Sequence, residues 1–82
     1  MSMSRTKDER FLIKLYEMAK ASGSPYNCKD QMVIGAALGL TDKVVVPMVT
    51  LLAQANFVKK VGPRGLSLTP RGEKLVQSLL DV

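Results

Sequence analysis

The stretch NFVKKVGPRGLSLTPRGEKL, residues 56–75, holds the strongest local structure signals in the chain. Strand-forming residues at 57–61 and 66–68 flank the turn sequence Gly-Pro-Arg-Gly. Thr69 then stands at the N-cap position of a helix whose first residue is Pro70, where a missing N–H group is tolerated. The stretch therefore predicts a β-hairpin that leads directly into a helix.

Upstream of this stretch, apolar residues recur at helical spacing in two segments, about 28–38 and 42–55. Asn27 is a good N-cap for the first segment, and Gly39 is the glycine expected just beyond its end. Two helices joined by a turn of three or four residues that contains glycine form a helix-turn-helix pattern. Pro47 lies inside the second helix, and we expect it to kink that helix or to loosen its first turn.

Helices are also predicted at both ends of the chain. Thr6 and Glu9 have the spacing of a capping box before an amphipathic segment at about 7–21, and an apolar stripe follows Pro70. The predicted order is helix, helix-turn-helix, hairpin and helix, so the fold class is α+β and mainly α. Because 82 residues have room for one core, we expect a single domain over 1–82, with disorder at 1–5.

The composition argues against several classes of protein. The chain contains no His and a single cysteine, Cys28, so it has no His for acid–base catalysis or metal binding and cannot form an intrachain disulfide. We therefore expect no enzyme, no metal and no cofactor. No apolar run reaches the roughly 18–20 residues that span a bilayer, and the polar start does not resemble a secretory signal. We expect a cytoplasmic protein that does not contact a membrane.

The positive charge is concentrated late in the chain. The net charge is +5, and residues 57–74 hold five Lys or Arg residues against Glu73 alone, which leaves +4 in that segment. Such a cluster suits a polyanion, most simply nucleic acid. A charged surface of this size is also common on small proteins that bind none. The composition leaves both interpretations open.

The element order and the stretch from Asn56 to Leu75, with its Leu-Thr-Pro-Arg-Gly exit at 68–72, resemble winged-helix domains of MarR- and PadR-type regulators. The resemblance implies a three-helix helix-turn-helix core, a two-stranded wing and a C-terminal helix. It also implies double-stranded DNA as a partner of a transcriptional regulator or chromosome-associated protein, which can act as a homodimer. Helix 42–55 would then lie towards the major groove, and wing 57–68 would lie on the backbone or in the minor groove.

One outward face of helix 42–55 is expected to carry the base contacts, because the opposite face must be buried. We expect the buried stripe to consist of Val44, Val45, Met48, Leu51, Leu52 and Ala55. The candidate DNA contacts are then Lys43, Thr50 and Gln54 on this helix, followed by Lys59, Lys60, Arg64 and Arg71 on and after the wing.

The same outward face also has apolar members, which give an alternative interpretation. They are expected to be Val46, Pro47, Val49 and Ala53. An exposed apolar patch usually marks a protein contact, so the alternative function is a winged-helix protein–protein interaction module. Thymine methyl groups are another surface that such side chains can cover. The residues alone leave this choice open.

Overall fold

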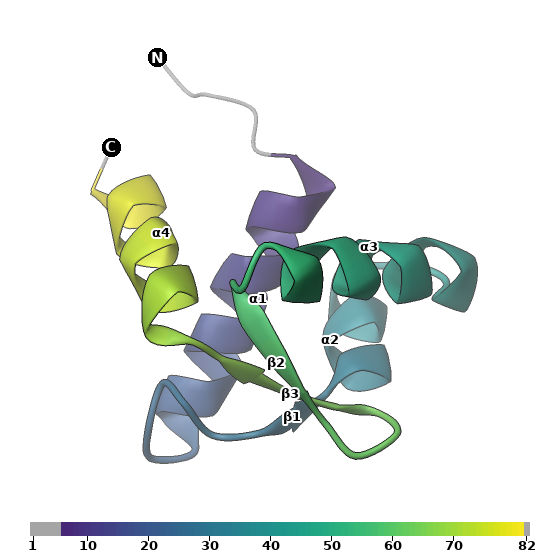
Figure 1. Ribbon diagram of the computed structural model, residues 1–82, viewed down its shortest axis with the longest axis horizontal. Helices are drawn as coiled ribbons and strands as arrows, with labels where there is room; N and C mark the ends of the chain where they lie inside the picture. Colours follow the sequence, from purple (N-terminus) through teal and green to yellow (C-terminus); the bar gives the residue numbers. More distant parts are fainter. Residues whose placement is uncertain (1–5, 82) are drawn as a thin grey trace.

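The computed structural model describes residues 6–81, which form a winged helix with a mainly helical α+β architecture (Figure 1). This confirms the predicted fold class. In chain order the elements are α1 (Lys7–Ala21), β1 (Lys29–Asp30), α2 (Gln31–Ala37), α3 (Asp42–Gln54), β2 (Val58–Val61), β3 (Gly65–Leu68) and α4 (Pro70–Leu80). The disorder expected at 1–5 lies outside the described residues, and a single domain over 1–82 stays a prediction.

Helix α1 is the scaffold of the core. It begins at the predicted capping box, in which Thr6 Oγ1 accepts from the Glu9 N–H at 3.2 Å and Glu9 Oε1 accepts from the Thr6 N–H at 2.9 Å. Phe11, Leu12 and Leu15 are buried, and the helix contacts α2, α4 and the sheet. Figure 1 shows α1 behind α3 and the sheet, and α2, α4 and the sheet pack against this one helix.

Helix α2 begins at Gln31 instead of at about residue 28, which corrects the predicted boundary. Its N-cap is Asp30, whose Oδ1 accepts from the Met32 N–H at 2.8 Å, and not Asn27. The reason is that Lys29 and Asp30 form β1, whose backbone pairs with β3. The chain therefore leaves a strand and enters a helix at a single residue, Asp30.

The sheet has three strands, whereas the sequence predicts a two-stranded wing. The strand order is β1-β3-β2 with antiparallel neighbours, and Lys29 and Lys60 are both register partners of Leu66. Leu66 and Leu68 are buried, so one face of β3 belongs to the core. β1 pairs with the edge of β3 that a hairpin alone would leave open. Two residues are too few to show the alternation by which strands are recognised.

The buried face of α3 differs from the predicted one. It consists of Val45, Met48, Val49 and Leu52, at positions i, i+3, i+4 and i+7. Leu51 was expected inside but is 61% exposed, and Val49 was expected outside but is 1% exposed. Ten apolar side chains between 44 and 55 surround the helix, so their spacing alone does not select a face. The helix runs through Pro47 as a continuous α-helix.

Helices α2 and α3 meet at 120°, a typical angle for a helix-turn-helix. Within residues 6–81, no single helix has both the length and the apolar composition to cross a membrane, and only this bent pair passes that test jointly. The two helices approach closely at Gly35, where an added Cβ would lie 2.5 Å from Cγ2 of Val45. The absence of a side chain at Gly35 is therefore what lets Val45 pack against α2.

The predicted entry into α4 is confirmed, and it is tied to the turn after α3. Thr69 Oγ1 accepts from the Gly72 N–H at 3.0 Å and donates to the Asn56 carbonyl at 2.5 Å. Asn56 lies just beyond the end of α3 and has a φ of 64°, a left-handed conformation that asparagine can adopt at this position. A Cβ on Gly72 would collide with the carbonyl oxygen of Phe57. The Leu-Thr-Pro-Arg-Gly motif thus joins α4 to the end of α3 as well as to the wing.

We expect the Gly72→Ala variant to lower the free energy of unfolding by about 1–3 kcal/mol, because the methyl group meets a backbone carbonyl that cannot rotate away. An exposed helical glycine would behave in the opposite way, gaining up to about 1 kcal/mol from alanine. Urea unfolding followed by circular dichroism measures the difference. Ser78→Ala, on the exposed side of the same helix, is the control and should be neutral or slightly stabilising. A Gly72→Ala protein as stable as the parent would contradict the close contact.

Candidate nucleic-acid interface

Helix α3 presents three polar candidates on one exposed side. Lys43, Thr50 and Gln54 are all exposed, and they lie opposite the face of α3 that is buried in the core. The Thr50 hydroxyl donates its proton to the carbonyl of Val46 at 3.1 Å, so its oxygen is left mainly as an acceptor. The hydrogen-bond donors that this side of α3 can offer to a partner are therefore the side chains of Lys43 and Gln54.

The apolar members of the same side are Val46, Pro47 and Leu51 rather than the predicted set. Val46 is 48% exposed, and Pro47 is also exposed. Val49 belongs to the core, and Ala53 is half-buried and packs against the core, so both leave the candidate patch. Leu51 was missed because it was assigned to the buried stripe. Its exposure follows from the observed buried face of α3, because Leu51 does not lie on that side of the helix.

The wing contributes two exposed lysines. Lys59 is the register partner of Ser67 on the outer face of the sheet, whereas Lys60 is paired with Leu66 on the inner face. Both side chains are nevertheless exposed, because β2 is buried only at Val58. Both candidate lysines of the wing are therefore accessible to a partner.

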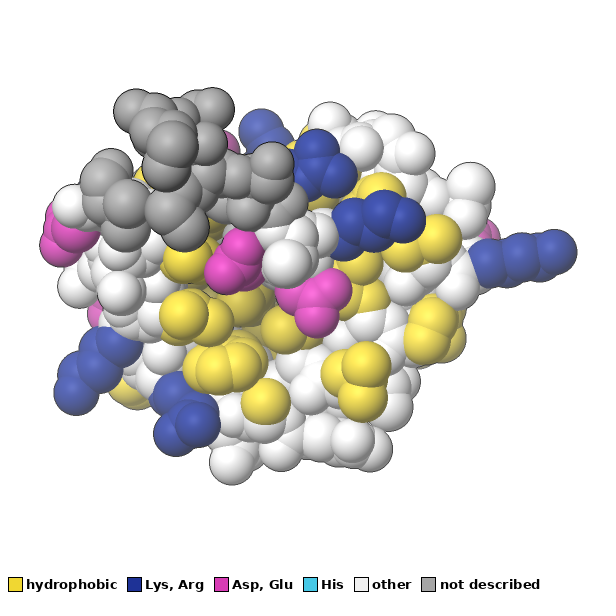
Figure 2. Space-filling view, turned by 90° about the horizontal axis from the view of Figure 1, so that it is seen from above, with side chains coloured by type: hydrophobic (Ala, Val, Ile, Leu, Met, Phe, Trp, Pro, Cys, Tyr) yellow, Lys and Arg dark blue, Asp and Glu magenta, His cyan; other side chains and the backbone are white. Residues whose placement is uncertain are grey.

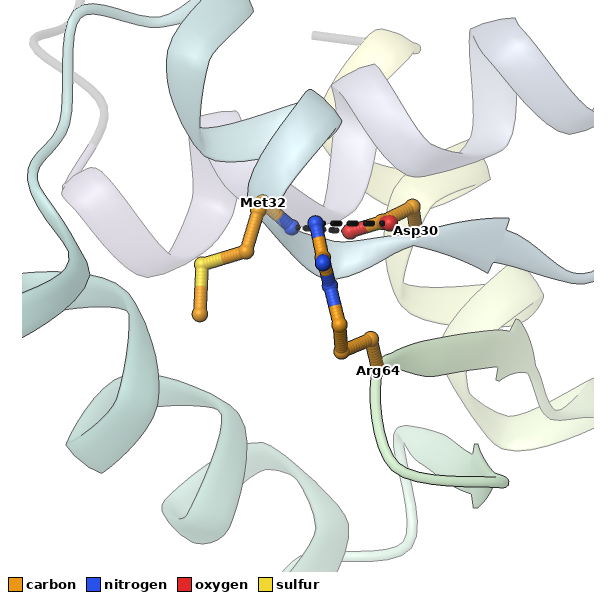
Figure 3. A network of polar contacts seen from close by, with 3 residues as sticks. All are labelled: Asp30, Met32 and Arg64. Atoms are coloured by element: carbon orange, nitrogen blue, oxygen red, sulfur yellow. Dashed lines mark hydrogen bonds and ion pairs between the residues drawn. The ribbon is translucent and has the colours of Figure 1, made fainter.

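Arg64, in the turn between β2 and β3, is held by a residue that is distant in the sequence (Figure 3). Its Nη2 lies 3.1 Å from Oδ2 of Asp30, the N-cap of α2. Its carbonyl also accepts from the Gln31 N–H at 2.8 Å. The sequence indicated a cation at the turn but not its partner, because nothing local relates positions 30 and 64.

Arg71 stands in the first turn of α4, beside the turn that follows α3. Its guanidinium carbon is 5.2 Å from the centre of the Phe57 ring, which is within the range of a cation–π contact. Glu73, on the same helix, accepts from the Tyr26 hydroxyl at 2.5 Å. This hydrogen bond raises the pKa of Tyr26, because the carboxylate favours the protonated phenol. Arg71 is therefore positioned by a ring while the neighbouring acid is engaged elsewhere.

Apolar side chains also gather where the ends of α1 and α4 approach α3. Figure 2, seen from above, shows hydrophobic side chains gathered in the middle of one face, with Lys and Arg side chains towards its edges. The N-terminal end of α1, the C-terminal end of α4 and the upper side of α3 meet on this face (Figure 1). Its apolar centre is separate from the wing, which lies on the other side of α3.

Metal-ligating side chains are not clustered in the described part of the chain. Between residues 6 and 81, no group of three or more His, Cys, Asp or Glu side chains is placed to hold a metal ion. Cys28 is free and exposed. The chemistry available at the helix-turn-helix and the wing is hydrogen bonding, ion pairing and apolar contact, which are the interactions of a binding surface.

Comparison with known proteins gives one partial similarity. The chain is 40% identical over 47 residues to the transcriptional regulator MntR of Salmonella typhimurium and, to the same extent, to that of Salmonella typhi. The matched residues are 57% of this chain and 30% of each regulator, so the chain spans only about a third of the curated relatives that it matches. No protein-family profile matches the chain. No solved structure matches it either.

Proposed function

We propose that this chain is a DNA-binding winged-helix protein that acts as a transcriptional regulator or a chromosome-associated protein. The observation that carries the proposal is the exposed side of α3, where Lys43, Thr50 and Gln54 lie on the second helix of a helix-turn-helix. The basic wing and the partial similarity to a transcriptional regulator support the same function. Such a role needs no catalytic group and no cofactor, and it is compatible with the cytoplasmic location that the sequence predicts.

In this proposal α3 enters the major groove, which is wide enough for an α-helix. The Gln54 amide has the donor and acceptor that match an adenine edge, and Lys43 donates to guanine or to a phosphate. Because the Thr50 proton is given to the carbonyl of Val46, its oxygen would accept from the amino group of adenine or cytosine. Val46 and Pro47 would cover thymine methyl groups.

The wing supplies the part of the affinity that does not depend on sequence. Lys59 and Lys60 are exposed and would pair with phosphates or enter the minor groove, and Arg71 would contact the backbone from the start of α4. Contacts of this kind fix the orientation of a protein on the duplex but carry no sequence information directly. Two copies that bind half-sites about 34 Å apart would form a homodimer on DNA.

A second candidate function rests on the exposed apolar residues of α3. Val46 and Leu51 are 48% and 61% exposed, and with the exposed Pro47 they form an apolar strip on the outer side of the helix. A protein–protein interaction module would use these two residues with Pro47 as the centre of its contact. The two functions differ in whether the apolar strip meets base methyl groups or another protein.

The first prediction concerns the phosphate contacts of the wing. Fluorescence-anisotropy titrations of random-sequence duplex DNA should show binding that weakens steeply with salt. The double variant Lys59→Gln/Lys60→Gln should reduce the slope of log K against log salt by about 1.8, because each lost phosphate contact removes about 0.9. Lys7→Gln/Lys14→Gln, which removes the same charge from α1, is the matched control and should retain nearly the parent slope. A parent protein with no salt-sensitive binding would refute the proposed function.

The second prediction concerns the apolar strip of α3. A duplex selected for tight binding from a random library should contain thymine opposite Val46, and its replacement by uracil should weaken binding about fourfold per methyl group lost, or about 0.8 kcal/mol. The penalty should shrink in Val46→Ala, because the contacting side chain is then shorter. Uracil placed in the flanking sequence is the control.

Insensitivity to uracil would instead favour the second candidate function. In that case Val46→Asp/Leu51→Asp should abolish self-association or partner binding in sedimentation experiments while the circular dichroism spectrum is unchanged. Both side chains are exposed, so the charges are tolerated by the fold. Val49→Asp would not be a useful test, because Val49 is buried in the core.

A further inference from the structure

The ion pair between Asp30 and Arg64 is the contact from which a further inference can be drawn (Figure 3). Two ion pairs occur within residues 6–81. The other pair, Lys14 with Glu17, joins neighbouring turns of the same helix, so only the Asp30–Arg64 pair connects different elements. Asp30 uses both carboxylate oxygens: Oδ1 accepts from the Met32 N–H at 2.8 Å, and Oδ2 lies 3.1 Å from Arg64 Nη2. The pair thus connects the start of the helix-turn-helix to the wing.

The wing is already attached to α2 without this pair. The Arg64 carbonyl accepts from the Gln31 N–H at 2.8 Å, and Asp30 and Gly65 are register partners in the sheet. Backbone hydrogen bonds of this kind keep the two segments together whatever the side chains at 30 and 64 are. The ion pair is therefore not the sole attachment between the wing and α2, and it also changes the charge that the wing presents.

The Arg64 guanidinium is only partly engaged. The Arg64 and Asp30 side chains are 62% and 36% exposed, so water and ions reach the pair and its strength is that of a surface ion pair. A guanidinium has five N–H donors, and a phosphate can bind it through two parallel hydrogen bonds. A phosphate that approaches the wing would therefore compete well for Arg64, but the Asp30 carboxylate would repel that phosphate.

We propose that Asp30 is an internal competitor of DNA phosphate for Arg64. In the free protein the carboxylate holds the guanidinium against the start of α2, and on duplex DNA a phosphate oxygen takes its place. This inference rests on the proposed DNA-binding function. Asp30 then weakens and regulates the contact of the wing with DNA. Arg64 can bind a phosphate only after it has separated from the Asp30 carboxylate.

The test is a double-mutant cycle of Asp30→Asn and Arg64→Gln, measured as affinity for random-sequence duplex DNA at several salt concentrations. Asparagine keeps an oxygen for the Met32 N–H and is as good an N-cap as aspartate, so α2 stays capped. Asp8→Asn, which changes the net charge equally at the far end of α1, is the matched control. Thermal unfolding of each variant confirms that the fold is intact.

We expect Asp30→Asn to bind about two- to fivefold more tightly than Asp8→Asn, the factor that a surface ion pair corresponds to. Its salt slope should be steeper by up to about one phosphate contact. Arg64→Gln should weaken binding only slightly in the parent but clearly in the Asp30→Asn background.

Three results would overturn the inference. Equal affinities of Asp30→Asn and Asp8→Asn would mean that Asp30 does not restrain Arg64. Weaker binding of both single variants by the same factor would mean that the pair is a brace after all. Absence of salt-sensitive binding by the parent protein would refute the proposed function and this inference with it. That result is distinguishable from failure of the inference alone, because it is seen in the parent protein without any variant.

Discussion

The packing of Val45 against Gly35 determines how the rest of the helix-turn-helix is arranged. A Cβ at Gly35 would lie 2.5 Å from Cγ2 of Val45, so α3 can take its place only because α2 has no side chain there. This contact fixes the rotation of α3 about its own axis. Met48, Val49 and Leu52 then point into the core, and Lys43, Thr50 and Gln54 point out. The surface available for binding is therefore a consequence of one buried contact.

Elements with strong local signals could be predicted from the sequence, and those defined by distant partners could not. The Thr6–Glu9 capping box and the Thr69-Pro70 start mark α1 and α4 by short-range chemistry, so both agree with the structure. Strand β1 depends on β3, which is more than 30 residues further along the chain, and its two residues have no pattern of their own. The boundary of α2 was wrong for the same reason, because Asp30 ends one element and caps the next.

The residue types of the candidate site could be predicted from the sequence, but the burial, hydrogen bonds and ion pairs of its side chains could not. The sequence indicates which side chains are charged, yet α3 is apolar on most sides, and the buried face had to be taken from packing against Gly35. Hydrogen bonding also changes what a residue offers: the Thr50 hydroxyl is turned towards its own helix. Arg64 was predicted as a free cation, but Asp30 is its partner. These are tertiary contacts, and no local spacing encodes them.

Charge and shape are divided between two parts of the proposed interface. Helix α3 contains one acidic and one basic residue, Asp42 and Lys43, so it contributes no net charge to the attraction of a polyanion. Positive charge comes from the wing and the start of α4, where it acts on phosphate regardless of sequence. Selection among sequences must then come from the outer side of α3, through few donors and an apolar strip. If the proposed function holds, a surface with this division would bind any duplex weakly through the wing and would discriminate mainly by fit against α3.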